Sequence, residues 1–149
     1  MFCRKVCWVF SIVICALLVG CNSAGRIKHS CSILLESCNE ACSQVVTLPV
    51  SCVDVAVAPV PLFTEQDIAK ISLRNCAYGC VLAMSLTDHA AYEMYKLSLE
   101  AVGRKLLFEC DGAIVGFSVI DDAADVHEIV FIPEISDENC FNLFGYGRK

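Results

Sequence analysis

The sequence lacks the short motifs on which most enzymes of this size depend. No serine lies in a Gly-x-Ser-x-Gly turn, and no glycine-rich phosphate loop is present. The Cys-x-x-Cys pair of thioredoxin-like proteins and the Cys-x-x-Cys-His sequence of haem attachment are also missing. Three histidines, His29, His89 and His127, could each act as a base, but none has a partner motif. We therefore expect no catalytic residues, no cofactor and no enzyme activity.

Basic residues are scarce, and one long stretch has none. The 149 residues include 11 Lys and Arg against 17 Asp and Glu. Between Leu106 and Tyr146 there is no Lys or Arg. An acidic chain excludes nucleic acid as a partner, and it disfavours electrostatic attraction to anionic lipid. The length allows one domain, and excludes a large multidomain enzyme.

Long apolar runs are confined to one place near the N-terminus. Arg4 and Lys5 precede a run of 13 residues, Val6–Leu18, without a charge. This run is shorter than the roughly 20 residues of a membrane-spanning helix. It has the length of a secretory signal, whose apolar core has about 7–15 residues. The sequence therefore predicts export of everything that follows.

The end of this run has a more specific pattern. Leu18-Val19-Gly20-Cys21 resembles the lipobox of bacterial lipoproteins. The resemblance implies that residues 1–20 are a signal peptide and that Cys21 carries diacylglycerol. Residues 21–30 would be a lipidated tether that attaches the protein to the cell membrane or, because Asn22 is not Asp, to an outer membrane. The alternative is a plain signal, cut near Cys21 or Ala24, and a freely secreted protein.

The twelve cysteines divide along the same boundary. Three lie within the signal, and Cys21 would be used for lipid. The eight that remain are disulfide candidates, because an even number in an exported chain indicates bridges. They are Cys31, Cys38, Cys42, Cys52, Cys76, Cys80, Cys110 and Cys140. Counting alone does not choose among their pairings.

The spacing of apolar residues predicts an α+β fold for residues 31–149. Helical periodicity indicates two to three helices, over residues 31–46, 64–86 and 87–105. In the last of these, five residues are expected to be buried: Ala91, Tyr95, Leu99, Val102 and Leu106. Alternating apolar residues after the Asp111-Gly112 turn predict strands over 113–120 and 126–132, with a short strand at 106–109. We expect the helices to pack on this small antiparallel sheet, with disulfides as staples.

Two of the predicted helices each place a pair of thiols one turn apart. Cys38 and Cys42 form one pair, and Cys76 and Cys80 form the other. We expect two bridges to clasp the helices, with zinc binding as the alternative because the spacing permits it. Cys110 is expected to pair with Cys140, which follows Pro133 in a polar loop.

The acidic residues near the C-terminus offer one candidate metal site. Asp121, Asp122, Asp125 and Glu128 could hold Ca²⁺, although their spacing is not that of an EF-hand. A solvated acidic turn is the preferred interpretation.

One further resemblance involves four short segments. Ala77-Tyr78, Cys110-Asp-Gly, Gly116-Phe117 and Glu128–Phe131 are similar to the N-terminal part of secreted class 3 lipases. The chain ends before any nucleophile, so the resemblance implies a fragment without catalytic residues. The preferred interpretation is an exported, lipid-anchored cell-envelope protein with a structural or binding role and an unknown protein partner.

Overall fold

The computed structural model describes residues 29–77, 79–121 and 127–145, and these form mainly antiparallel strands. The strands are β1 (Cys31–Leu35), β2 (Gln44–Thr47), β3 (Asp54–Val57), β4 (Phe63–Thr64), β5 (Ile68–Cys76), β6 (Gly79–Leu86), β7 (Lys105–Cys110), β8 (Ala113–Val119) and β9 (Glu128–Pro133). A single 3-10 turn, η1 (Glu40–Cys42), and two short helices, α2 (Asp88–Glu100) and α3 (Asp137–Phe144), complete the described elements. The predicted α+β class is therefore wrong.

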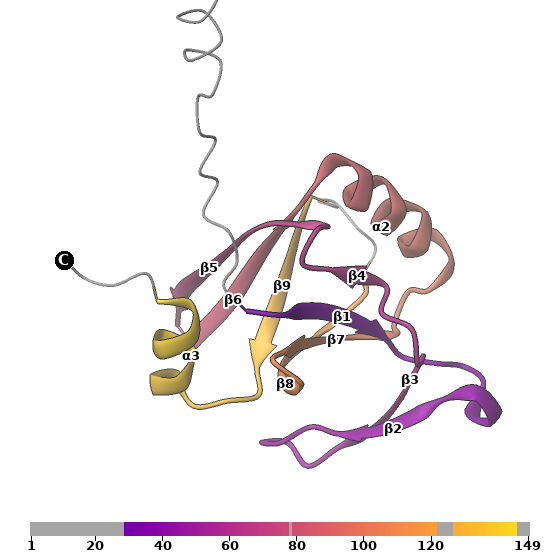
Figure 1. The fold of residues 1–149 in the computed structure, drawn as a ribbon, viewed down its shortest axis with the longest axis horizontal. Helices are drawn as coiled ribbons and strands as arrows, with labels where there is room; N and C mark the ends of the chain where they lie inside the picture. Colours follow the sequence, from indigo (N-terminus) through magenta and orange to yellow (C-terminus); the bar gives the residue numbers. More distant parts are fainter. Residues whose placement is uncertain (1–28, 78, 122–126, 146–149) are drawn as a thin grey trace, which may run out of the picture.

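Seven strands form one curled sheet, in the order β4-β1-β7-β8-β9-β6-β5, and β2 pairs with β3 in a separate sheet. In Figure 1, β1 and β7 run across the view while β6 and β9 run steeply. The strand direction thus turns along the sheet, as the right-handed twist of strands requires.

Two hydrophobic cores lie on opposite faces of the large sheet. The main core joins one face to α2 and α3. Its fully buried members include Ile33, Leu82, Met84, Leu106, Phe108 and Phe131. The second core joins the other face of β1, β7 and β8 to the β2–β3 sheet, and contains Leu34, Leu48, Val55, Val57, Leu107 and Ile114. The chain thus has three layers where β1 and β7 pass through its centre.

The burial of β1 between two cores explains why its sequence predicts a helix. Ile33 belongs to the main core and Leu34 to the second, so both faces of this strand are buried. A strand buried on both faces has a continuous apolar run instead of an alternating one, and such a run resembles a buried helix. The helix predicted over 31–46 is instead β1, η1 and β2.

A hairpin replaces the helix predicted over residues 64–86. β5 and β6 pair antiparallel from Ile68↔Leu86 to Cys76↔Gly79. Gly79 has φ +123°, a conformation that residues with a side chain rarely adopt, and this allows the chain to reverse. Leu82, Met84 and Leu86 are buried and alternate along β6, which is the period of a strand.

The C-terminal strands agree with the prediction. β7 and β8 form a hairpin whose turn residues, Asp111 and Gly112, have φ angles of 51° and 79°. Two positive φ angles are typical of the type I′ turn that Asp-Gly favours. β9 follows, and pairs with both β6 and β8.

The two helices differ from the prediction in separate ways. α2 begins where expected, because the Thr87 side chain accepts a hydrogen bond from the Ala90 N–H. It ends at Glu100, before the predicted boundary at Lys105. α3 occupies the segment that was expected to be a loop after Pro133; Ser136 caps it and Asp137 and Glu138 begin its first turn. A capping serine followed by two acids is an ordinary start of a helix, so the sequence did contain a signal for α3.

Candidate functional site

Four chemically versatile side chains meet where β1 begins and β7 ends. We call them the His29 cluster: His29, Cys31, Cys110 and Asp111. The His29 Nδ1 atom lies 2.7 Å from Asp111 Oδ2, and Asp111 Oδ1 accepts a hydrogen bond of 3.0 Å from the Ser30 N–H. The sulfurs of Cys31 and Cys110 are 3.9 Å apart. Residues separated by about 80 positions in the sequence thus converge through strand pairing.

The turn at Asp111 orients the cluster. Asp111 is the first of the two central residues of the type I′ turn, and its N–H donates to the Ser30 carbonyl at 2.8 Å. The carboxylate therefore faces the segment that enters β1. Its pKa is lowered, first by the hydrogen bond from His29 and then by the Ser30 N–H.

Burial dominates the chemistry of the two thiols. Cys31 is 1% exposed, and burial, followed by the proximity of Cys110, raises its pKa to about 12. Burial also raises the pKa of Cys110. Because the thiolate is the nucleophilic form of cysteine, neither residue has the properties of a catalytic nucleophile.

The cluster also contains a possible set of metal donors. One ligand atom each from His29, Cys110 and Asp111 lies within 4.8 Å of the others. Imidazole, thiolate and carboxylate are the donors that zinc uses in proteins. His29 and Asp111 are partly exposed, whereas the Cys110 sulfur faces the main core.

The other predicted disulfide cysteines are spread over the molecule. Cys38 and Cys42 lie near η1, and Cys76 and Cys80 lie on both sides of the β5–β6 turn. In Figure 1, η1 and the β5–β6 turn are at opposite ends of the fold. The two helices that the predicted clasp requires are β-structure, so the clasp loses its basis. Within the described residues, no two cysteines are at disulfide distance.

Cys52 and Cys140 have different surroundings. Cys52 is exposed in the β2–β3 turn and has φ 55°. Cys140 is buried in α3, where burial, with Cys80 and Asp137 as neighbours, raises its pKa to about 11. The structure therefore does not bring Cys110 and Cys140 together as expected. Cys110 lies against Cys31, and Cys140 has Cys80 as its cysteine neighbour.

The predicted calcium site remains a prediction, because the structure describes only two of its four residues. Asp122 and Asp125 lie outside the described residues. Glu128 forms a two-pronged ion pair with Arg74, with N–O distances of 2.7 and 2.5 Å. A carboxylate held in this way already has a cationic partner.

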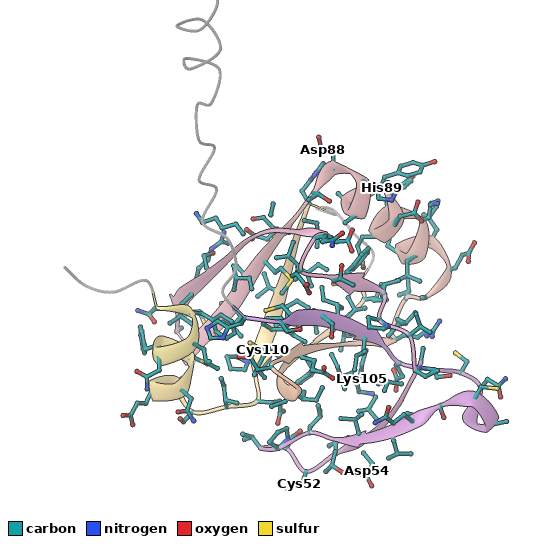
Figure 2. The ribbon with its side chains drawn as sticks, in the orientation of Figure 1. Cys52, Asp54, Asp88, His89, Lys105 and Cys110 are labelled. Atoms are coloured by element: carbon teal, nitrogen blue, oxygen red, sulfur yellow. The ribbon has the colours of Figure 1, made fainter. Side chains whose placement is uncertain are left out.

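The histidines are not gathered around one thiol either. Figure 2 shows His89 beside Asp88 at the start of α2, well away from Cys110. The resemblance to class 3 lipases also weakens, because Ala77 lies in the β5–β6 turn and not on a helix.

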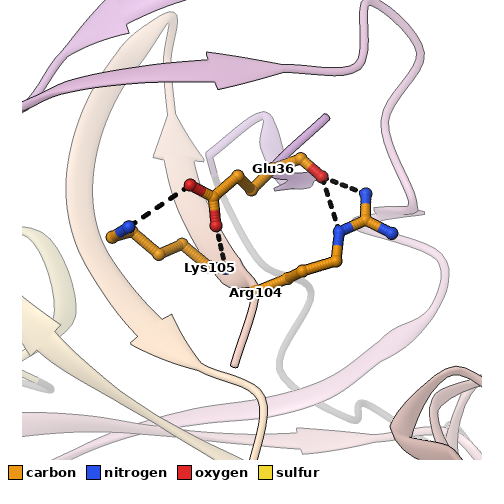
Figure 3. Close-up of polar contacts among 3 residues, drawn as sticks. All are labelled: Glu36, Arg104 and Lys105. Carbon is orange, nitrogen blue, oxygen red and sulfur yellow. Dashed lines mark hydrogen bonds and ion pairs between the residues drawn. The ribbon is translucent and has the colours of Figure 1, made fainter. Parts of the chain in front are cut away.

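Two buried or half-buried carboxylates tie together segments that are far apart in the sequence. Glu36 joins the end of β1 to the start of β7: its side chain accepts hydrogen bonds from the Lys105 N–H and Nζ, and its carbonyl accepts from Arg104 (Figure 3). Glu134 is only 3% exposed, and its Oε2 accepts the N–H groups of Val50 and Ser51 at 2.7 and 2.9 Å. It therefore ties the β2–β3 turn to the end of β9.

The outer side of α2, with the turn that follows it, forms an apolar surface. Three of its residues, Tyr95, Leu99 and Val102, were expected to be buried. The α2 surface comprises Tyr92, Tyr95, Leu99 and Val102, which are 61%, 47%, 67% and 58% exposed. The buried face of the helix is instead formed by Ala90, Ala91, Met94, Ser98 and the following Ala101. The small core residues Ala90 and Ala91 let the helix approach the sheet, and the larger apolar residues are left outside.

Neither helix in the described part of the chain has the length and apolar character needed to span a bilayer. No family model matches the sequence, and no curated protein matches it.

The fold does resemble two solved structures of SecDF. One, a crystal structure of SecDF in its super-membrane-facing form, is 16% identical with a TM-score of 0.55, over 76% of this chain and 18% of that chain. The other, of SecDF as a membrane component that enhances protein export, is 15% identical with a TM-score of 0.56, over 80% and 62%. This chain therefore spans less than two thirds of either structure, and the likeness establishes a shared fold.

Proposed function

We propose that this protein is an exported binding domain of the cell envelope, held at a membrane by lipid on Cys21. The apolar run Val6–Leu18 and the cysteine that follows it support export and anchoring. Cys31 begins β1 only ten residues after Cys21, so a short tether would hold the domain close to the membrane surface. The shared fold with SecDF, a membrane component that enhances protein export, supports an envelope location.

A binding role fits the side chains better than a catalytic role does. The Cys110 thiol near His29 is buried, and burial favours its protonated form. His29 is already bonded to Asp111. These groups hold a turn in place and offer no activated nucleophile.

The observation that carries the binding role is the α2 surface. Tyr92, Tyr95 and Leu99 are exposed on a helix whose other face is packed on the sheet, and Val102 is exposed just after the helix ends. Contiguous apolar patches on an otherwise polar surface mark interaction sites. The arrangement corresponds to the helix-in-groove mode of recognition, in which residues at i, i+3 and i+7 are anchors.

The charges around the α2 surface indicate the kind of partner. Asp88, Glu93 and Glu100 lie on the same helix, and Lys96 is paired with Glu93 at 2.7 Å. The rim is thus net acidic. Anionic lipid would be repelled, whereas an envelope protein with an apolar groove bordered by Lys or Arg would be attracted. We take such a protein to be the occupant.

The experiment places a photo-reactive amino acid at position 99 in the full-length protein in cells. The control has the same residue at Val60, which is 73% exposed in the connection between β3 and β4. We expect one discrete adduct from position 99 only, with a partner whose cross-linked peptide borders basic residues. The companion substitution Tyr95→Asp should abolish this adduct without changing the midpoint of unfolding.

Three results would contradict the proposal that the α2 surface binds an envelope protein. An adduct of twice the mass would identify a second copy as the occupant. Equal adducts from positions 99 and 60 would indicate non-specific contact. Sedimentation of the purified protein with anionic vesicles, lost in Tyr95→Asp, would identify lipid as the occupant.

A further inference from the structure

Strand pairing places Cys31 directly opposite Cys110. The Asp111 N–H donates to the Ser30 carbonyl just outside this pair, so Cys31 and Cys110 form a non-hydrogen-bonded pair of the antiparallel ladder. The Cα atoms of such pairs are about 4.5 Å apart, and their side chains are the closest in a sheet. A disulfide needs Cα atoms about 4.4–6.8 Å apart.

The side chains already point toward each other. Their sulfurs are 3.9 Å apart, and both residues lie on the main-core face, at 1% and 3% exposure. The pairing of β1 with β7 already brings the two residues together, and rotation about their Cα–Cβ bonds would bring the sulfurs closer. Among the eight cysteines in the described part of the chain, Cys31 and Cys110 share a register position and have their sulfurs in contact.

We propose that Cys31 and Cys110 form a cross-strand disulfide in the exported protein. The pair replaces the pairing of Cys110 with Cys140 that the sequence suggested. The oxidant is the disulfide of a thiol oxidoreductase in the compartment to which the protein is exported. Two S–H bonds break and one S–S bond forms; two electrons and two protons pass to the oxidant, whose disulfide becomes a dithiol.

The surroundings favour a disulfide over a metal at this place. A disulfide is neutral and needs no polar partner, so it fits the main core, where both sulfurs lie. Zinc would require a thiolate on the Cys110 sulfur, and burial opposes that charge. Cys31, although it touches Cys110, is not part of the donor group of His29, Cys110 and Asp111.

The position of the bond gives it a mechanical consequence. Cys31 is the first residue of β1 and therefore the first residue of the sheet after the tether. Force applied through the tether would separate β1 from β7 starting at this pair. A covalent bond at the first pair transfers that force to β7 at once. This consequence depends on the proposed anchoring, whereas the disulfide itself depends only on the proposed export.

Mass spectrometry of the full-length protein, purified without reductant from the exporting compartment, tests the proposal. We expect a peptide that joins Cys31 to Cys110, lighter by about 2 Da than the two reduced peptides. The melting temperature should fall on the order of 10–20 °C on reduction, because the bond closes a long loop. Cys31→Ala/Cys110→Ala should melt at the lower temperature and respond little to reductant.

The exposed pair provides a matched control. Cys38→Ser/Cys42→Ser should retain the Cys31–Cys110 peptide and the large response to reductant. The proposal is overturned by free Cys31 and Cys110 thiols in the purified protein, by a peptide joining Cys110 to Cys140, or by stoichiometric zinc that is lost in His29→Ala. Failure of the Cys21 anchoring would leave the joined peptide unchanged, so the two proposals fail separately.

Discussion

Replacing Glu134 should loosen the contact between the β2–β3 turn and the large sheet. Its Oε2 accepts two backbone N–H groups, from Val50 and Ser51, while the residue is 3% exposed. Hydrogen bonds to a charged group contribute about 1.5–3 kcal/mol each. Val50 and Ser51 are exposed residues, so water can solvate their freed N–H groups in the variant and reduce the loss. We therefore expect Glu134→Ala to lower the free energy of unfolding by about 2–4 kcal/mol.

The conservative substitution gives the reasoning its sharpest test. Both bonds end on one oxygen, so the amide oxygen of Glu134→Gln can still accept both, and only the charge is lost. We expect a loss of about 1 kcal/mol for this variant. Urea unfolding of both variants, with the exposed Glu65→Ala as control, measures the difference. Equal stabilities for Glu134→Ala and wild type, within about 0.5 kcal/mol, would refute the role of this carboxylate.

Two further substitutions test local features of the fold. Thr87→Ala removes the cap of α2 and should lower the free energy of unfolding by about 1 kcal/mol, measured by urea unfolding, with Thr87→Ser restoring most of it. Asp111→Asn keeps a residue suited to positive φ but removes the charge that faces His29. Because the folded-state pKa of Asp111 is lowered, its stabilisation is present above the ordinary pKa of an aspartate and is lost as the pH falls through the lowered value. The stability difference between wild type and Asp111→Asn should therefore shrink as the pH falls below about 4; a difference that grows on acidification would contradict this.

The C-terminal strands could be predicted because their signals are local. Asp111-Gly112 favours one type of turn, and the apolar residues of β8 follow directly after it. The capping threonine at position 87 similarly marked the start of α2. In each case, the residues that determine the structure are neighbours in the sequence.

The N-terminal half was predicted wrongly because its pattern depends on distant layers. Ile33 and Leu34 face different cores, so β1 shows no alternation, and the second core exists only once β2 and β3 have folded over the sheet. The exposed face of α2 was missed for a related reason. Ala91 is buried as predicted, but Tyr95 and Leu99 are exposed, because the close approach of α2 to the sheet selects small residues for its buried face.

The candidate site could not be predicted, because it depends on the register between β1 and β7 and no local sequence pattern determines that register. Cys31 and Cys110 become neighbours only through the pairing of β1 with β7. His29 joins them because Asp111 turns its carboxylate back toward the segment before β1. The cysteine count indicated bridges, but the choice of partners required the sheet.

The most direct test of the proposed function is fatty-acid labelling of Cys21. Cells that express the full-length protein or Cys21→Ser are grown with radioactive palmitate, and each protein is then partitioned between detergent and aqueous phases. We expect label and detergent partitioning for the wild-type protein, and neither for Cys21→Ser. Absence of label from both proteins, with the wild-type protein recovered in the aqueous phase of the medium, would contradict lipid anchoring and indicate a freely secreted protein.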